Sequence, residues 1–201
     1  IVREIGAAGA REVHENGIGV WLTPAINIHR TPLCGRNFEY YSEDPLVAGE
    51  MAAAMVEGIQ SEGVGASLKH FACNNKETNR KDCDSRLSER ALREIYLKGF
   101  ELCVKKAQPL TVMSSYNLVN GLWASQNREL LTDILRGEWG FKGMVTTDWY
   151  THAPQYTEIA AGNDVKMGCG DPAHVLQMMR EGRLKREDVV VSVRRLLEMI
   201  L

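Results

Sequence analysis

The sequence lacks any long apolar segment: no stretch of its 201 residues approaches the roughly 18 apolar residues of a membrane-spanning helix. It also lacks an initiator Met and a signal-like start, since Ile1-Val-Arg-Glu already has helical character. No GxGxxG, Walker or HExxH pattern is present. We therefore expect a fragment of a longer protein, with no membrane association, no bound metal and no cofactor.

Cysteine is scarce and irregularly spaced. The chain has five cysteines, an odd number, with no CxxC or Cys/His spacing typical of a metal site. Free thiols favour a reducing compartment, so we expect a cytoplasmic protein. Cys73 and Cys83 are near enough in sequence to pair, although nothing in the pattern demands a disulfide.

A basic surface is also missing. The 24 Lys and Arg residues are intermixed with 26 Asp and Glu residues, and the net charge is -2. This pattern leaves no basic stripe for nucleic acid and no acidic tail. The composition favours a small neutral or weakly polar ligand.

Short apolar or β-branched runs alternate with longer amphipathic stretches, which predicts an α/β fold with a parallel sheet and helices outside it. The length suits one domain over residues 1–201. We predict strands at residues 18–23, 66–71, 110–116, 143–148 and 164–167. We predict helices at residues 1–15, 45–62, 88–106, 127–139, 154–161, 173–181 and 187–200.

Polar residues with chemical potential follow the ends of the predicted strands, where the active sites of (β/α)8 barrels lie. They include Lys69, His70, Tyr116 and Asp148. Five strands are countable, whereas a closed barrel has eight. We therefore expect a TIM-type barrel that is incomplete in this chain, with its opening strands upstream of residue 1.

Asp148 and Trp149 directly follow the predicted strand at residues 143–148. A glycosidase needs an ionised carboxylate below the anomeric carbon, and an aromatic ring provides an apolar wall for the sugar. The alternative is that Asp148 only caps the next helix, and the Asp-Trp pair alone does not decide between them.

Lys69 and His70 end another predicted strand and suit several sugar hydroxyls at once. Because neighbouring side chains on a strand normally point to opposite faces, the pair suggests irregular backbone or one structurally buried residue. Arg36 and Arg80 lie in long loops, where a guanidinium can clamp adjacent hydroxyls, although a single loop Arg is usually a surface residue.

The remaining polar residues have plainer interpretations. Met113 and Tyr116 belong to the core by default, although Tyr116 at a strand end could reach a ligand. Glu39, which precedes a predicted helix together with Glu43 and Asp44, is interpreted with them as a helix-dipole or cap residue. For Asp164 we favour a structural role, in a polar layer or satisfying backbone near neighbouring glycines.

Taken together, the motifs closely resemble glycoside hydrolase family 3, in particular its β-glucosidases. The resemblance runs almost end to end, in order and with sensible spacing. The motifs are G-R-N-F-E-Y-Y-S-E-D-P (35–45), S-L-K-H-F (67–71), N-N-K-E-T-N-R (74–80), L-S-E-R-A-L-R-E-I-Y (87–96), V-M-S-S-Y-N-L-V-N-G (112–121), L-L-T-D-I-L-R-G-E-W-G-F-K-G (130–143) and T-D-W (147–149).

The resemblance implies a role for each matching residue. Asp148 matches the nucleophile of a retaining mechanism, with Tyr116 beside it and Trp149 as a wall of the subsite. Four residues match those that bind the sugar in the family, namely Arg36, Lys69, His70 and Arg80. We add Met113 to the predicted substrate-binding residues. The family is also known for unusual peptide geometry at its Lys-His pair, so we predict a non-proline cis peptide near residues 69–71.

The resemblance also implies missing parts. The general acid/base of the β-glucosidase branch usually comes from a companion α/β sandwich domain, and a further sugar-gripping carboxylate lies upstream. The expected reaction is hydrolysis of terminal non-reducing β-D-glucosyl residues from small β-glucosides or oligosaccharides.

Other readings remain open. A β-xylosidase or mixed glucosidase/xylosidase is the enzymatic alternative, and a catalytically silent carbohydrate-binding fragment is the other. A hexosaminidase is disfavoured because the loop at residues 72–85 has no His. Homo-oligomerisation is left open.

Overall fold

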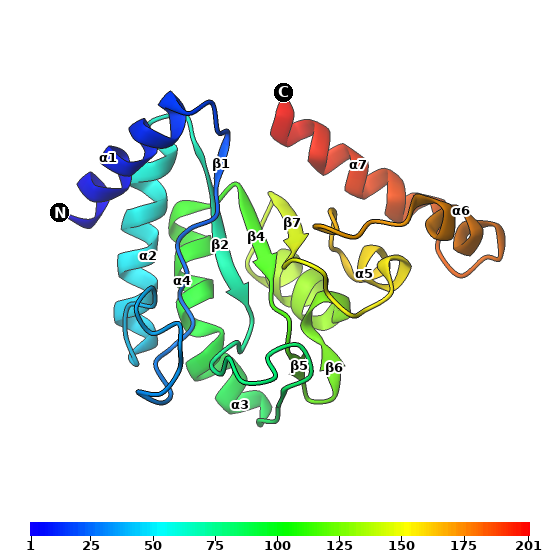
Figure 1. Cartoon of the computed structure of the whole chain (residues 1–201), viewed down its shortest axis with the longest axis horizontal. Helices are drawn as coiled ribbons and strands as arrows, with labels where there is room; N and C mark the ends of the chain where they lie inside the picture. Colours follow the sequence, from blue (N-terminus) through cyan, green and yellow to red (C-terminus); the bar gives the residue numbers. More distant parts are fainter.

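The computed structural model describes all 201 residues, and its centre is an open four-stranded parallel sheet (Figure 1). The strands are β1 (Val20–Trp21), β2 (Gly65–Phe71), β4 (Thr111–Ser114) and β7 (Met144–Thr147), and they lie side by side in chain order. Each new strand is therefore added at the same edge of the sheet, with helical segments between successive strands. This is the α/β fold predicted from the sequence, and the open sheet is consistent with part of a (β/α)8 barrel.

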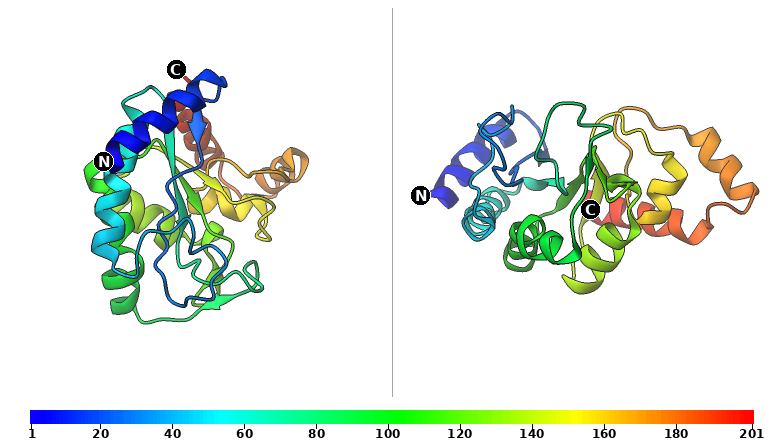
Figure 2. Two further views of the ribbon diagram at one scale, coloured as in Figure 1. Left: turned by 60° about the vertical axis from the view of Figure 1, so that its left-hand side comes forward. Right: turned by 90° about the horizontal axis from the view of Figure 1, so that it is seen from below.

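The helices agree with the predicted ones to within a few residues, except that the short 3-10 turn at residues 124–126 was not predicted. They are α1 (Val2–Glu15), α2 (Pro45–Gln60), α3 (Glu89–Ala91), η1 (Leu92–Tyr96), α4 (Lys98–Ala107), η2 (Ala124–Gln126), η3 (Glu129–Glu138), α5 (Gln155–Ala161), α6 (Pro172–Arg180) and α7 (Arg186–Ile200). The single helix predicted at residues 88–106 is thus divided, because η1 is a π-helical turn. Figure 2 shows α1, α2 and α4 packed side by side along one flank of the sheet.

The start of α2 follows its capping chemistry. Asp44 Oδ1 accepts the backbone N–H of Leu46 at 2.7 Å, and Pro45 occupies the first turn. Ser42, the other candidate cap, instead accepts the N–H of Asp44 with its hydroxyl at 3.0 Å. Asp44 is therefore the cap, and the long irregular loop before it ends at this residue.

The helices approach each other closely through small residues. A Cβ at Gly58 of α2 would lie 2.0 Å from the backbone oxygen of Arg3 in α1. The buried rings of Phe71, Phe100 and Trp139 meet edge to face, with centroid distances of 5.2 and 5.8 Å from Phe71. This cluster fixes the end of β2 against α4 and the end of η3, so the strand that carries Lys69 and His70 has a rigid base.

The fifth predicted strand, at residues 164–167, is present only as a single bridge between Val165 and Thr146 of β7. The carboxylate of Asp164 accepts Arg136 at 2.9 Å, Arg195 at 3.0 Å and the N–H of Val145 at 2.8 Å. Asp164 is thus structural, as predicted, but it satisfies the backbone of β7 rather than that around nearby glycines. Burial lowers the pKa of Arg136 to about 10.

A second, small sheet was not predicted. β3 (Asp84–Ser85) pairs in parallel with β5 (Leu118–Val119), which turns back into β6 (Leu122–Trp123). The turn between β5 and β6 uses Gly121 at φ 87°, a left-handed conformation that favours glycine. Strands of two residues leave no readable alternation in a sequence. This sheet joins the loop at residues 72–83 to the segment after β4.

All five cysteines are free thiols, and Cys73 and Cys83 are not joined in a disulfide. Three of the five are buried, at positions 34, 73 and 103. Burial raises the pKa of Cys73 to about 12, so this thiol stays protonated at neutral pH. None of the helices has the length and apolar character needed to cross a membrane.

Candidate active site

A cavity of about 230 Å³ opens at the carboxyl ends of β2, β4 and β7. All eight residues predicted to form the site line this cavity, and they come from segments between 36 and 149 in the sequence. The lining residues are Leu22, Arg36, Lys69, His70, Arg80, Met113, Tyr116, Asp148 and Trp149. The parallel strands explain the convergence, since their carboxyl ends meet at one edge of the sheet.

Asp148 is delivered into the cavity by β7. Its backbone N–H donates to Ser114 O of β4 at 3.0 Å, and its side chain is nearly buried, with the residue 5% exposed. Oδ1 accepts the N–H of Trp149 at 2.8 Å, whereas Oδ2 has no hydrogen-bond partner. One oxygen is therefore held in place and the other is free to meet a ligand.

Burial raises the pKa of the Asp148 carboxyl above its ordinary value. The N–H of Trp149, the nearby hydroxyl of Tyr116 and the charges of Arg80 and Arg36 oppose this shift. The carboxyl group is thus desolvated but surrounded by groups that favour its ionised form. Burial together with the charge of Asp148 raises the pKa of Tyr116 to about 12.

His70 lies beside this carboxylate, with 3.8 Å between its Nε2 and Asp148 Oδ2. Burial, together with the positive charges of Arg36, Lys69 and Arg80, lowers the pKa of His70 well below its usual value. The ring is consequently neutral at neutral pH. It can donate one hydrogen bond to a ligand without adding charge to the cavity.

Asn27 fixes the backbone of His70. Its side chain donates to His70 O and accepts the N–H of His70, both at 2.9 Å. The Lys69–His70 and Phe71–Ala72 peptides are cis, which confirms the predicted non-proline cis peptide. The register of β2 on β4 also shifts between Leu68 and Phe71. Side chains therefore do not alternate regularly between the two faces of the sheet at this point, and both Lys69 and His70 border the cavity.

The contacts of Glu39 contradict its interpretation as a residue that serves the dipole of the following helix. Its carboxylate accepts Arg36 Nε and lies 3.5 Å from Lys69 Nζ, so it bridges two cations of the cavity. The helix-dipole role belongs to Asp44 alone at this end of α2. The sequence interpretation was wrong because Lys69, the second partner, is distant in sequence, and only the i,i+3 spacing from Arg36 signalled a contact.

Arg80 is held from two sides. Its Nη1 donates to Glu77 Oε2 at 2.8 Å, and its guanidinium stands 4.7 Å from the centroid of the Tyr116 ring. Lys81 lies over the same ring and donates to the backbone oxygen of Tyr150 at 3.1 Å. The loop of Arg80 is therefore tied to the loop that follows Asp148.

Three apolar side chains complete the cavity. Trp149 is 45% exposed and stands at the rim, whereas Met113 is buried on β4. Leu22 follows β1 and was not predicted as a site residue. Its position after a strand end was the available signal, but a lone Leu there is indistinguishable from a core residue.

The site can hold a polyhydroxylated ring and present one carboxylate oxygen to it. Arginine, lysine, histidine and tyrosine supply donors around the cavity. Two further carboxylates lie nearby, and both are paired with cations: Glu39 with Arg36 and Glu77 with Arg80. Asp148 Oδ2, by contrast, has no hydrogen-bond partner. No three His, Cys, Asp or Glu side chains gather as a metal site would require.

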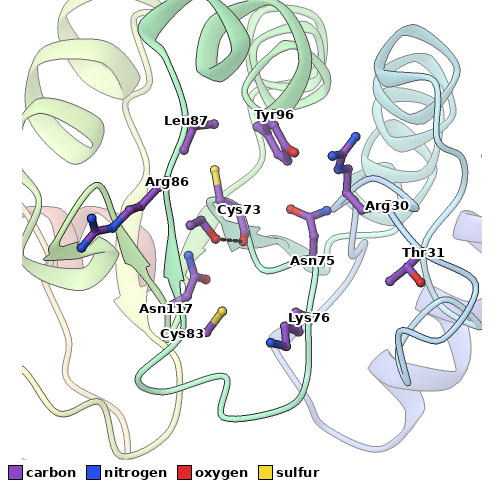
Figure 3. A pocket seen from close by; sticks show the side chains of 11 residues that line it. Arg30, Thr31, Cys73, Asn75, Lys76, Cys83, Arg86, Leu87, Tyr96 and Asn117 are labelled. Carbon is purple, nitrogen blue, oxygen red and sulfur yellow. Dashed lines mark hydrogen bonds between the residues drawn. The ribbon is translucent and has the colours of Figure 1, made fainter.

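A second cavity, of about 300 Å³, is lined in part by residues of the loop at residues 72–83 (Figure 3). Its lining includes Arg30, Lys76, Arg86 and Tyr96, and the hydroxyl of Ser85 donates to Cys73 O at its floor, at 3.1 Å. It contains no carboxylate and none of the predicted site residues. All the predicted site residues therefore border the other cavity, the one that contains Asp148.

Comparison with known sequences places these observations in a family. The profile described as "Glycosyl hydrolase family 3 N terminal domain" matches residues 1–199. The chain belongs to glycosyl hydrolase family 3, and the resemblance deduced from its motifs is confirmed.

Individual relatives are enzymes acting on glycosides. β-Glucosidase A of Butyrivibrio fibrisolvens is 57% identical over 189 residues, which cover 94% of this chain and 23% of that protein. An exo-α-(1→6)-L-arabinopyranosidase of Bifidobacterium breve is 48% identical, over 92% of this chain and 24% of that protein. The chain thus spans about a quarter of the length of these relatives.

Solved structures support the fold. The structure of β-glucosidase 3B from Thermotoga neapolitana in complex with α-D-glucose superposes with a TM-score of 0.96 and 49% sequence identity. It covers 99% of this chain, and this chain covers 29% of it. The predicted α/β architecture is therefore shared with a known β-glucosidase.

Proposed function

We propose that this chain forms most of the barrel domain of a retaining β-glucosidase, with Asp148 as the nucleophile. The observation that carries the proposal is Asp148 Oδ2, a buried carboxylate oxygen without a hydrogen-bond partner in a cavity lined by sugar-binding donors. The similarity to β-glucosidase A of Butyrivibrio fibrisolvens supports the same activity. A helix cap would use its carboxylate on the N–H groups of the next helix, whereas Asp148 Oδ1 accepts the N–H of Trp149 and the next helix, α5, begins only at Gln155.

In the proposed first step, Asp148 Oδ2 attacks the anomeric carbon and the glycosidic C–O bond breaks. The leaving oxygen takes a proton from a carboxylic acid, and a covalent glycosyl ester remains on Asp148. In the second step the deprotonated acid takes a proton from water, which attacks the anomeric carbon and frees Asp148. The sugar is released with its original anomeric configuration, because two inversions have occurred.

The general acid/base is proposed to come from outside these residues. A retaining site needs two carboxyl groups about 5–5.5 Å apart. The other carboxylates that contact residues of this cavity, Glu39 and Glu77, are both committed to cations. The relatives are several times longer than this chain, which leaves room in them for a companion domain that would supply the missing acid.

The proposed ligand is a single terminal sugar ring. The cavity of about 230 Å³ is smaller than the roughly 300–1,000 Å³ typical of drug-sized pockets. Its lining is rich in donors, and the neutral His70 ring adds one without adding charge. We propose that Arg36, Lys69, His70 and Arg80 bind the hydroxyls, with Trp149 as the wall at the entrance.

A pentopyranoside is the second candidate substrate. The arabinopyranosidase relative is 48% identical to this chain, and L-arabinopyranose is a pentose, as is the xylose that a β-xylosidase releases. A pentopyranose lacks the C6 hydroxymethyl group of glucose. Comparing kcat/KM on nitrophenyl β-glucoside, β-xyloside and α-L-arabinopyranoside with the full-length enzyme separates these substrates.

The nucleophile is tested in the full-length enzyme with a 2-fluoro glucoside and with Asp148→Ala. The fluoro sugar should label Asp148 and no other residue in peptide mapping. The variant should lose activity by about 10⁴-fold or more and regain it with azide, giving the α-glucosyl azide by a single inversion. Asp133→Asn, a change at an exposed carboxylate, is the matched control. Label at another residue, or a β-azide product, would contradict the assignment.

A further inference from the structure

A buried ion pair lies behind the loop that follows Asp148. Lys166 Nζ donates to Glu158 Oε2 of α5 at 2.8 Å, and the two side chains are 7% and 1% exposed. Neither residue lines the cavity of Asp148. A buried ion pair gains little over a well-packed apolar pair, because both charges must be desolvated. Stability alone therefore gives no reason for these two charges.

The ammonium group holds the loop at residues 149–154. It lies within hydrogen-bond distance of Thr151 O at 3.1 Å, Thr151 Oγ1 at 2.9 Å and Ala153 O at 2.9 Å. The hydroxyl of Thr151 in turn donates to Glu158 Oε1 at 2.7 Å. Three ammonium hydrogens are thus shared among four oxygens, and three of these belong to the loop.

This loop begins at Asp148 and is the one whose backbone holds the carboxylate. Trp149 N–H donates to Asp148 Oδ1 at 2.8 Å, and the next residue, Tyr150, donates its N–H to Met167 O at 3.1 Å. Met167 adjoins Lys166 in the chain. The segment that carries Lys166 therefore grips the loop at Tyr150 through its backbone and at Thr151 through its side chain (Figure 1 shows this segment between β7 and α6).

We propose that Lys166, whose positive charge is balanced by Glu158, is a positioning residue. It fixes the Asp148 carboxylate by anchoring the loop that follows Asp148. The inference rests on the proposed function, in which Asp148 is the nucleophile. A displacement of about 1 Å at a reacting group can cost roughly 100-fold in rate. The proposed sugar-binding side chains Arg36, Lys69 and His70 stand on segments outside this loop. Trp149 belongs to the loop and Lys81 ties the Arg80 loop to it, so we expect a large effect on bond formation and a small one on sugar binding.

The experiment uses the full-length enzyme and three variants. Lys166→Met removes the ammonium, and Lys166→Met/Glu158→Gln removes it without leaving an unpaired buried charge. Lys106→Met is the matched control, because it deletes the same charge from the exposed ion pair with Glu50. For each enzyme we measure the rate constant of labelling by a 2-fluoro glucoside, the final stoichiometry of label and the inhibition constant of glucose.

Both Lys166 variants should reach nearly full labelling with a rate constant lower by about 10- to 100-fold. Glucose should bind within about threefold of its normal affinity, and Lys106→Met should behave as the unaltered enzyme. A purely structural role would lower the stoichiometry and leave the rate constant of the remaining competent sites unchanged, which would overturn the inference. If the single variant does not fold, the double variant decides.

Thr151→Val provides an independent variant that keeps both charges and the side-chain volume. Thr151→Val should also lower the rate constant of labelling. If both Thr151→Val and the double variant are labelled at the normal rate, the positioning role is refuted. The outcomes also separate the two proposals. Label outside Asp148 in the unaltered enzyme refutes the proposed function, whereas label at Asp148 with normal rates in the Lys166 variants refutes only this inference.

Discussion

Glu39→Gln is the perturbation that tests most directly how the cavity holds its cations. The carboxylate bridges Arg36 and Lys69, and all three side chains are about one-fifth exposed or less. A hydrogen bond to a charged group contributes about 1.5–3 kcal/mol, or about 10- to 150-fold in affinity. The amide oxygen of Gln can still accept one hydrogen bond, so the loss should lie toward the lower end of this range.

We expect kcat/KM of the full-length enzyme on an aryl glucoside to fall by about 10- to 30-fold, mainly through KM. Arg36 and Lys69 contact the sugar before and during bond formation in the proposed mechanism, which is why binding suffers more than turnover. Steady-state kinetics at constant pH and ionic strength measure the effect.

Glu43→Gln is the matched control, because Glu43 lies four residues further along the same loop and is exposed. It should change kcat/KM by less than about twofold, as surface charges far from a site contribute little. The reasoning would be refuted if both variants behaved alike, since the two residues would then share the helix-dipole role that their sequence positions suggested.

Three further predictions concern charge and packing. Arg80→Met should move the acidic limb of the pH profile of kcat/KM to higher pH, because the reaction requires ionised Asp148 and Arg80 lowers the pKa of that carboxyl. An unmoved limb, or an equal shift in the control Arg90→Met at an exposed arginine, would contradict this. Asp164→Asn should destabilise the protein to denaturant by about 3 kcal/mol, because the part-buried Arg136 and Arg195 lose the counter-charge of a fully buried carboxylate; the exposed Asp133→Asn control should be neutral. Gly58→Ala should lower the free energy of unfolding by about 1–3 kcal/mol, since its Cβ would meet α1, whereas Gly137→Ala, with 3.5 Å to the nearest atom, should not.

Most of the fold could be predicted because its elements are long enough to show their period. The helices α2 and α7, for example, each span at least four turns, and α2 begins at Pro45, where the sequence predicts it. The strands were found from β-branched runs that end at polar residues. The small sheet of β3, β5 and β6 was missed, because two residues carry no alternation.

The site was predicted where a residue type and a strand end coincide, as at Asp148 and His70. The order of the family-like motifs then added Arg36 and Arg80 to the predicted site. No local pattern distinguishes these two loop residues from surface arginines. Glu39 was misinterpreted because its second partner, Lys69, is thirty positions away, and contacts between loops leave no signature in a single sequence. Long-range contacts of this kind arise from the fold itself.

The carboxylates paired with cations around the cavity have a consequence over the catalytic cycle. Before reaction, Glu39, Glu77 and ionised Asp148 match the positive charges of Arg36, Lys69 and Arg80. In the proposed mechanism, forming the glycosyl ester removes the negative charge of Asp148 while the general acid from outside this chain becomes the new carboxylate. Among the groups of this chain, one positive charge is then left without its counter-charge. That excess favours the return of a carboxylate anion. The side chains of this chain are therefore balanced in charge before the reaction, and after ester formation they favour the step that breaks the ester and restores the Asp148 anion.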